Sequence, residues 1–305
     1  MPNWQEVLNE IQQETSKGQL AVDNVRRRYM AELAKETGRN LIAYYSGWLQ
    51  KSHPSIWDAL SINDDDKNGF MSTVHRLDRS KGVDLILHTP GGGIAATESI
   101  VSYLKKMFGI NLRVIVPQIA MSAGTMIACA AEEILMGEHS NLGPIDPQYS
   151  GISCEGVLEE FRKALEAVKK DPDSLALWKI IIEKYHPTFL GDCEKTIKWS
   201  KEITREWLKQ GMFKNDTRAK YKITKILSVL SSHRKTFSHG RHIPIETCEN
   251  IGLKIVRIEK LGDKLQDLIL TVHHAFMHTF ANTGAIKIIE NQNGIAKVDI
   301  RNIGR

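Results

Sequence analysis

Apolar and polar positions along the chain follow two different periods. Short apolar runs rich in β-branched residues predict four strands, at residues 41–45, 83–88, 112–116 and 134–136. Apolar residues three or four positions apart predict two helices between and after these strands, at residues 95–108 and about 123–131. Strands that alternate with helices are typical of a largely parallel sheet covered by helices. The pattern therefore predicts an α/β core over residues 38–150.

The segments on either side of this core have mainly helical patterns. Apolar residues recur at helical spacing near the start, and the first 30 residues therefore predict one amphipathic helix. Residues 156–232 predict helices almost throughout, with breaks near 171–172, 186–187 and 211. A strand at 253–258 and a long helix at 261–280 follow. We divide the chain into an N-terminal helical segment (1–37), the α/β core (38–150) and a mainly helical C-terminal lobe with one returning strand (151–305).

Composition favours a folded protein outside the membrane. Hydrophobic residues make up 42% of the 305 residues and charged residues 25%, which is enough to bury a core without disulfides. The most apolar stretch, 119–136, contains Glu132 and Glu133, so we expect no membrane span. The first residues do not show the pattern of a secretory signal, and we therefore expect a cytoplasmic protein. The 4 cysteines form no C-x-x-C pair, which predicts packed, reduced thiols.

Two patterns resemble metal sites but lack essential ligands. Residues 64–69, Asp-Asp-Asp-Lys-Asn-Gly, reproduce the opening of an EF-hand loop, but His75 stands where a bidentate glutamate should be. We expect a solvated helix cap before Phe70 rather than a calcium site. His274 and His278 have the spacing of zinc ligands on a helix, but no H-E-x-x-H motif surrounds them. We therefore predict a packed helix and no metal.

Candidate chemistry lies at two turns of the α/β core. Residues 88–93, His-Thr-Pro-Gly-Gly-Gly, directly follow a predicted strand and precede a helix. The glycines permit positive φ and close approach, so their N–H groups could bind a phosphate or an oxyanion. The spacing matches neither dinucleotide motif nor P-loop, which weakens a nucleotide interpretation. Taken alone, the turn also fits a purely structural role.

The second turn, residues 120–124, is Ala-Met-Ser-Ala-Gly and follows the next strand. Small residues two positions either side of Ser122 are typical of a nucleophile elbow, although Ser122 alone also fits a helix cap. Adjacent turns at one sheet end would let the N–H groups of Gly92 or Gly93 and of Ala123 converge on a carbonyl oxygen attacked by Ser122. The two turns together predict acyl transfer.

These motifs carry a family resemblance. Their order, strand, Pro-Gly-Gly-Gly, helix, strand, Met-Ser-Ala-Gly, helix, resembles the ClpP/crotonase superfamily and, within it, peptidases related to signal peptide peptidase A. Residues 85–92, 120–125 and 142–148 resemble more closely the serine dehydrogenase proteinase family, which is described as Clp-fold serine proteinases. The resemblance extends from residues 42–45 to residues 287–291.

The resemblance implies a ClpP/crotonase-like spiral of ββα units and self-association into rings. It also implies that Ser122 is the nucleophile and that the glycine turn is the oxyanion hole. The reaction would be attack on a peptide carbonyl of a peptide or protein substrate, formation of an acyl-enzyme, and hydrolysis by water. No metal or organic cofactor is implied.

The general base is the open question, because an unassisted serine hydroxyl is a poor nucleophile. The catalytic histidine of ClpP would fall near residues 145–148, where Asp146 stands instead, so that triad is not carried over. Asp146 could orient a base or simply form a turn before Pro147.

Either a lysine or a histidine could be the base. Relatives of signal peptide peptidase A use a lysine from the helical region after the serine, kept neutral by burial. Three lysines lie in that region: Lys163, Lys169 and Lys170. Histidine candidates are His139 and His239, the latter in a histidine-rich stretch that matches one of the family. Lys163 and His239 are our candidates, and the spacing does not choose between them.

Charge is distributed unevenly and suggests an alternative function. Residues 195–241 hold 13 Lys or Arg and 3 Asp or Glu, whereas the whole chain has a net charge of +5. Trp199, Trp207 and Tyr221 lie among these basic residues, as in nucleic-acid binding surfaces. A catalytically idle Clp-fold protein could use this segment to bind nucleic acid or another polyanion. No known nucleic-acid motif is visible, so we favour a helical arm or a subunit interface.

A third possibility is a non-hydrolytic relative, since the same fold also carries acyl-CoA hydratases and isomerases. Those enzymes do not need a serine at the elbow, so Ser122 disfavours them.

Overall fold

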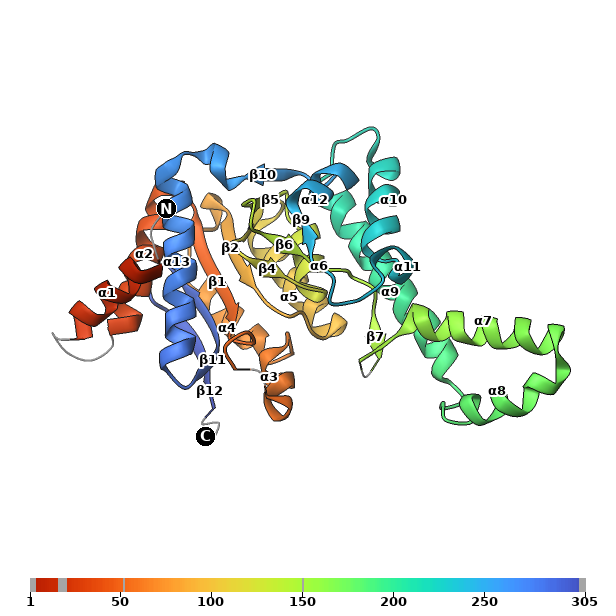
Figure 1. Ribbon diagram of the computed structural model, residues 1–305. Coiled ribbons are helices and arrows are strands. Elements are labelled where there is room, and N and C mark those ends of the chain that lie inside the picture. Colours follow the sequence, from red (N-terminus) through yellow and green to blue (C-terminus); the bar gives the residue numbers. More distant parts are fainter. Residues whose placement is uncertain (1–3, 16–20, 52, 150, 302–305) are drawn as a thin grey trace.

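A seven-stranded sheet forms the centre of the protein (Figure 1), in the order β10-β5-β3-β2-β1-β11-β12. The computed structural model describes residues 4–15, 21–51, 53–149 and 151–301. The strands of this sheet are β1 (Asn40–Ser46), β2 (Val83–His88), β3 (Leu112–Val116), β5 (Glu133–Met136), β10 (Ile255–Arg257), β11 (Ala285–Asn291) and β12 (Ala296–Ile300). The five strands from β10 to β1 are parallel, whereas β11 is antiparallel to both of its neighbours. The predicted α/β class is confirmed.

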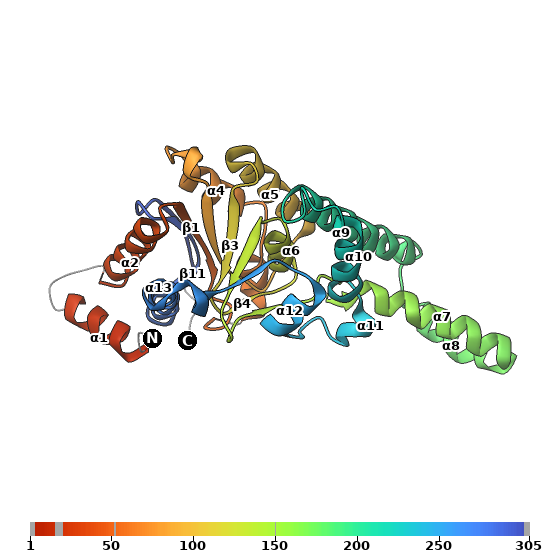
Figure 2. The same cartoon turned by 90° about the horizontal axis from the view of Figure 1, so that it is seen from above.

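Helices cover both faces of this sheet. Figure 2 shows α2 and α13 on one side and α6 and α9 on the other. The covering helices are α2 (Ala21–Thr37), α4 (Asp66–Val74), α5 (Ile94–Phe108), α6 (Ala123–Cys129), α9 (Phe189–Gln210) and α13 (Asp263–Asn282). Ile42 and Tyr44 of β1 belong to one hydrophobic cluster, and Leu41, Ala43 and Tyr45 belong to the other. Burial on both faces explains why β1 and β2 are continuous apolar runs.

A small second sheet lies beside the carboxyl ends of the parallel strands. It consists of β4 (Ile119–Ala120), β6 (Asn141–Leu142) and β9 (Ile243–Pro244), in the order β4-β6-β9. β4 directly precedes the serine turn, and β9 follows the histidine-rich stretch. This sheet therefore brings together segments that are more than a hundred residues apart in sequence.

A helical arm extends away from the sheet. Its helices α7 (Cys154–Lys170) and α8 (Leu175–Ile182) project from the rest of the molecule in both views (Figures 1 and 2). The arm joins the core where α7 packs against α9, through a buried cluster that contains Cys154, Val157 and Cys193. The chain then continues through α10 (Ala219–Leu230), α11 (His233–Thr236) and α12 (Ile245–Ile251). The predicted helix breaks near residues 171–172, 186–187 and 211 are confirmed.

The remaining elements of the described chain are one N-terminal helix, one short helix, a small hairpin and four 3-10 turns. They are α1 (Trp4–Thr15), α3 (Trp57–Leu60), the hairpin of β7 (Gln148–Tyr149) and β8 (Ile152–Ser153), and the 3-10 turns η1 (Pro54–Ile56), η2 (Arg79–Lys81), η3 (Pro172–Ser174) and η4 (Ile258–Leu261).

The structure differs from the sequence-based expectations in three places. The first 30 residues form two helices, α1 and α2, rather than one. The segment 151–305 supplies three strands to the central sheet, because β11 and β12 follow the predicted returning strand. The acidic loop is solvated only in part: Asp65, at the N-cap position of α4, is exposed, whereas Asp66 is fully buried and its carboxylate contacts Lys287 Nζ at 2.8 Å. His278 packs as predicted, with its ring 4.0 Å from that of Trp4.

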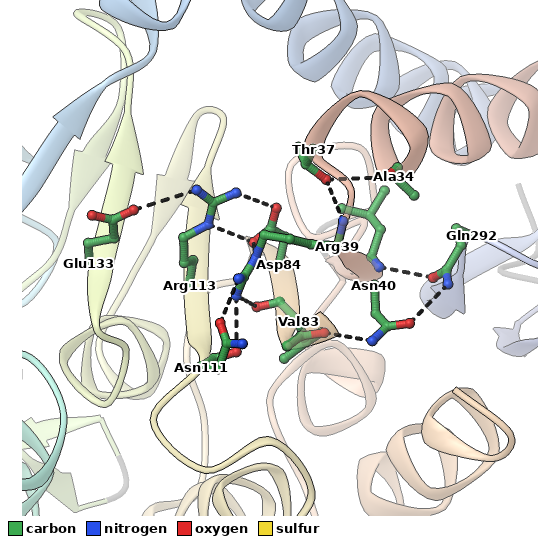
Figure 3. A network of polar contacts seen from close by, with 12 residues as sticks. Ala34, Thr37, Arg39, Asn40, Val83, Asp84, Asn111, Arg113, Glu133 and Gln292 are labelled. Carbon is green, nitrogen blue, oxygen red and sulfur yellow. Dashed lines mark hydrogen bonds and ion pairs between the residues drawn. The ribbon is translucent and has the colours of Figure 1, made fainter. Parts of the chain in front are cut away.

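A network of hydrogen bonds and ion pairs links the amino ends of the parallel strands to one another (Figure 3). Asp84 at the start of β2 is fully buried and accepts hydrogen bonds from Arg39 Nε at 2.6 Å and from Arg113 Nη2 at 2.7 Å. Arg39 also donates to Asn111 Oδ1 at 2.5 Å. Both carboxylate oxygens of Asp84 thus accept hydrogen bonds from arginines, as the burial of a charged group requires. This network supports the scaffold at the sheet end opposite the glycine and serine turns.

Two expectations about the chain as a whole can be compared directly with the structure. All four cysteines are buried and free, which confirms packed thiols. Among the helices of the described residues, none has both the length and the apolar character needed to cross a bilayer.

Candidate active site

Ser122 occupies a strained turn between β4 and α6. Its backbone has φ 51° and ψ −115°, a conformation that residues other than glycine rarely adopt. Its side chain makes no capping hydrogen bond to α6, so the simple helix-cap interpretation is not supported. Gly124 must be small, because a Cβ there would lie 2.5 Å from Thr89 Cγ2. The turn therefore has the strain and the small neighbours of a nucleophile elbow.

The glycine turn packs directly against this serine. A Cβ on Gly91, which has φ +100°, would lie 2.6 Å from Ser122 Cβ and 3.1 Å from Ala123 N. Thr89 and Ala120 form a bridge between the two turns, with Met121 N donating to Thr89 O at 3.0 Å. The two turns that the sequence analysis placed at one sheet end are thus in contact.

Hydrogen bonding divides the N–H groups of the glycine turn into engaged and free donors. Gly93 N donates to Ile62 O at 2.9 Å, and Gly91 N donates to Thr89 Oγ1 at 3.1 Å. Within the described part of the chain, the N–H groups of Gly92 and Ala123 have no acceptor. Gly92 is solvent-exposed. The free donors are therefore Gly92 and Ala123, whereas Gly93, also a candidate, is engaged by Ile62.

Segment 61–63 holds the glycine turn in place, and the sequence analysis did not identify it. Ile62 N donates to Gly91 O at 2.7 Å, so Ile62 binds the turn on both sides of Gly92. A Cβ on Gly92 would lie 2.3 Å from the Ile62 backbone, which explains why glycine is required there. Lys287 Nζ in turn donates to Ser61 O at 2.7 Å. No local motif marks this support, because its parts come from distant segments.

Asp146 lies buried between two histidines. Its side chain is 1% exposed, and its two oxygens accept hydrogen bonds from different histidines. His239 Nδ1 lies 2.9 Å from Oδ1, and His233 Nδ1 lies 3.0 Å from Oδ2. An ionised carboxylate only accepts hydrogen bonds, so this arrangement places hydrogen on both Nδ1 atoms, and Nε2 is the nitrogen with a lone pair whenever the ring is neutral. Asp146 therefore orients two imidazoles.

Helix α11, which begins with His233, and the loop after it, which carries His239, bring both histidines to this carboxylate. Phe237 ends α11 with φ 63°, a left-handed conformation that reverses the chain between the two histidines. Arg241 Nη1 donates to Lys235 O at 3.2 Å and closes the loop from the other side. The first turn of α7 holds α11 in place, because Glu155 accepts a hydrogen bond from His233 N. The base of the arm and the histidine pair are thus physically connected.

A cavity of about 490 Å³ joins His239 to the two turns. Pro90, Met121 and His239 all line it, and Pro90 and Met121 are the residues directly before Gly91 and Ser122. His139, another candidate, also lines this cavity. Among the described residues, Ser122 Oγ has no hydrogen-bond partner in this structure. In many enzymes the hydrogen bond between the nucleophile and its base forms only when substrate binds.

The lysine candidate lies elsewhere. Lys163 is on α7 of the projecting arm, its side chain is 58% exposed, and it pairs with Glu160 at 3.4 Å. Lys169 and Lys170 are exposed at the end of the same helix. A lysine base needs burial to stay neutral, and none of these three has it.

The described residues contain no group of three or more His, Cys, Asp or Glu side chains that could hold a metal ion.

Comparisons with known proteins agree with this fold, which is a mixed α/β architecture of the ClpP-like type. The model of the family described as ClpP-like SDH-type serine proteinases matches residues 17–269. The chain belongs to this family.

Two similar proteins come from Methanocaldococcus jannaschii. Uncharacterized protein MJ1495 is 29% identical over 238 residues, which cover 77% of this chain and 76% of that protein. Uncharacterized protein MJ0137 is 31% identical over 197 residues, which cover 64% of this chain and 60% of that protein. Neither name describes an activity, so the reaction must be argued from the site.

Proposed function

We propose that this protein is a serine peptidase that forms an acyl-enzyme on Ser122. The observation that carries the proposal is the pairing of a strained, uncapped serine with two free backbone donors, Gly92 and Ala123. A structural turn needs neither the strain nor the free donors. Two such donors beside a nucleophile form an oxyanion hole, whose loss typically costs about 10²- to 10³-fold in rate per donor.

We propose His239 as the general base and Asp146 as the group that orients it. The hydrogen bond to Asp146 fixes Nδ1 as the protonated nitrogen and leaves Nε2 to accept a proton. His239 also lines the cavity beside Met121 and Pro90, whereas Lys163 points into solvent on the arm. The triad would thus follow the chain order serine, aspartate, histidine.

The reaction follows from these positions. Ser122 Oγ bonds to the peptide carbonyl carbon while its proton moves to His239 Nε2, and the carbonyl oxygen, now negative, binds the N–H groups of Gly92 and Ala123. The imidazolium returns the proton to the leaving amine as the C–N bond breaks. Water then attacks the acyl-enzyme, gives its proton to His239, and releases the acid and Ser122.

Labelling with a fluorophosphonate probe tests the nucleophile. We expect the folded wild type to be labelled at least about 100-fold faster than Ser122→Ala, because only an activated serine reacts with this electrophile. Labelled peptides identified by mass spectrometry should contain Ser122. Ser55→Ala, on the exposed turn η1, is the matched control and should label like the wild type. A folded wild type that is not labelled, or equal labelling of Ser122→Ala, would contradict the proposal.

Binding of nucleic acid by residues 195–241 receives less support. Trp207 is 7% exposed and belongs to the core, and Trp199 Nε1 donates to Glu98 at 3.2 Å. The segment holds five Phe, Trp or Tyr residues, of which Tyr221 and Phe237 are widely exposed, and Arg241 lies over the Phe237 ring at 5.8 Å. Base stacking needs several accessible aromatic faces, and two histidines of the segment already bind Asp146.

We also propose that the protein acts as a homo-oligomer that assembles through the arm. Leu165, Leu177 and Ile180 are 64%, 63% and 62% exposed, which is unusual for three large aliphatic residues on one projecting element. A cavity of about 660 Å³ with mainly apolar walls lies beside them, between α7, α8 and α9. A second copy that presents the same arm would cover these side chains.

The double variant Leu177→Glu, Ile180→Glu should convert this oligomer to monomers, because it places charges in the proposed apolar contact. Size-exclusion chromatography with light scattering measures the mass. Lys179→Glu, on the same helix and with an exposed side chain, is the control and should keep the wild-type mass. A monomeric wild type would contradict the proposed assembly.

A further inference from the structure

The cavity beside the serine turn has a large apolar wall. Trp48, Leu49 and Trp57, from the segment after β1, line it together with Ile119 and Met121. Leu49 and Trp57 are 51% and 46% exposed, so large apolar surfaces lie open to water at its mouth. A bound apolar group would cover them, and burial of an aromatic side chain removes about 150–250 Å² from water.

Among the described residues, the polar part of these walls contains no carboxylate, lysine or arginine. The polar residues that line the cavity are amides and histidines such as Gln118, Asn141 and His242. Behind Trp48 lies His88, with ring centroids 4.5 Å apart. Burial lowers the pKa of His88 to about 3, so this support is neutral. A lysine or arginine side chain would find no carboxylate here, and burying an unpaired cation is costly.

The cavity also has the position of a specificity pocket. It begins at Pro90 and Met121, the residues that directly precede the glycine turn and Ser122. A substrate carbonyl held by Gly92 and Ala123 would place the side chain of the same residue at this opening. The residue that supplies the scissile carbonyl is therefore the one whose side chain the cavity selects.

We propose that this cavity binds the substrate side chain on the acyl side of the scissile bond, and that the enzyme cleaves after large aromatic residues and not after lysine or arginine. This inference rests on the proposed peptidase function, because it takes the serine turn as the reacting centre. Trp57 and Trp48 would supply the aromatic contacts, and the absence of a lining carboxylate would exclude cations.

Two measurements separate the pocket from the chemistry. The first uses acetyl tetrapeptides that end in Phe, Leu, Lys, Glu or Gly, with binding to Ser122→Ala followed by tryptophan fluorescence. We expect the Phe peptide to bind at least about 10-fold more tightly than the Lys and Gly peptides. The second uses the same sequences with an aminocoumarin leaving group and the wild type, where kcat/KM for Phe should exceed that for Lys by at least about 100-fold.

Three substitutions in the walls, made separately, should change this preference. Trp57→Ala should weaken binding of the Phe peptide about 10-fold and leave the Gly peptide unaffected. Gln118→Glu and, separately, Asn141→Asp introduce a carboxylate and should raise Lys relative to Phe by at least about 10-fold. Tyr221→Ala, exposed on α10, is the matched aromatic control and should bind like Ser122→Ala alone when made in that background.

The outcomes distinguish the two proposals. Equal binding of the Phe and Lys peptides, or a Phe preference that survives Trp57→Ala, would overturn the pocket assignment even if Ser122-dependent cleavage occurs. Tight, Trp57-dependent binding of Phe without any cleavage would support the pocket and contradict the peptidase function. A preference for Glu over Phe would show that the histidines, not the tryptophans, select the substrate, and would also overturn the assignment.

Discussion

Replacing Asp146 with asparagine is expected to lower kcat for peptide hydrolysis by about 10³- to 10⁴-fold, with little change in KM. The carboxylate accepts a hydrogen bond from His239 Nδ1 and thereby leaves Nε2 free to take the proton of Ser122. An asparagine that presents its N–H group to His239 stabilises the opposite tautomer of that imidazole. His239 would then offer a hydrogen to Ser122 where it should accept one. Initial rates with fluorogenic peptides measure the effect.

Three comparisons separate this role from a loss of structure. Circular dichroism and urea unfolding should show that Asp146→Asn is folded under the assay conditions. His239→Ala should cause a similar loss of kcat, and the two losses should not add, because both residues act through one proton transfer. Lys163→Ala should keep wild-type activity. An active Asp146→Asn enzyme would contradict the role given to Asp146, and an inactive Lys163→Ala enzyme would place the base on the arm and contradict the role given to His239.

The sequence predicts the serine and glycine turns of this site better than it predicts the pair of Asp146 and His239. Ser122 and the glycine turn could be found because each is a local pattern at the end of a strand, and parallel strands bring such turns to one sheet edge. The sequence also gave a reason to consider Asp146 and His239, but not to pair them. These two residues are 93 positions apart, and their contact depends on the reversal at Phe237 and on the small sheet that ends in β9. The spacing of apolar and polar residues along the chain does not indicate a contact between residues so far apart.

Oxyanion donors show a similar limit. The sequence offered Gly92 and Gly93 equally, since glycine at either position permits close approach. Only the contact with Ile62, which engages the N–H of Gly93 and leaves that of Gly92 free, distinguishes them. Ile62 carries no motif and belongs to a segment that the sequence analysis did not connect with the site.

Strand β11 was missed because its polar residues are buried. Period-two patterns identify strands when polar side chains face water, but all seven residues of β11 are buried, including Lys287 and Glu290. Each finds an opposite charge on another element: Glu290 accepts from Arg26 Nε at 2.7 Å, and Lys287 pairs with Asp66. The charges look like a surface pattern in the sequence, and only the tertiary partners show otherwise. The same ion pair explains why Asp66 of the calcium-like loop is buried and not solvated.

This buried pair gives the largest stability effect that we expect. Lys287 and Asp66 are 1% and 0% exposed, and Tyr44 Oη donates a further hydrogen bond to Asp66 at 2.8 Å. Lys287→Met should lower the free energy of unfolding by about 3–5 kcal/mol, because it leaves a buried carboxylate without a counter-charge. Lys297→Met, which removes a partly exposed lysine from the next strand, is the matched control and should cost about 1 kcal/mol or less. Urea unfolding at constant m-value measures both.

The pH dependence of the Lys287→Met variant identifies the cause of its instability. Burial raises the pKa of Asp66 above its ordinary value even in the wild type, where Lys287 opposes the shift. Without Lys287 the folded state binds the carboxyl proton more tightly than the unfolded state does, so the variant should gain stability as the pH falls through the folded pKa toward the unfolded one, and lose it as the pH rises back through that range. Adding Asp66→Asn should restore most of the lost stability at neutral pH, since it removes the charge itself. A pH-independent loss, unchanged in the double variant, would mean that the packing of the lysine stem and not its charge is what β11 requires. The double variant should regain stability without regaining the wild-type kcat. Its buried carboxylate is gone and needs no counter-charge, but Lys287 no longer donates to Ser61 O, next to the Ile62 that positions Gly92.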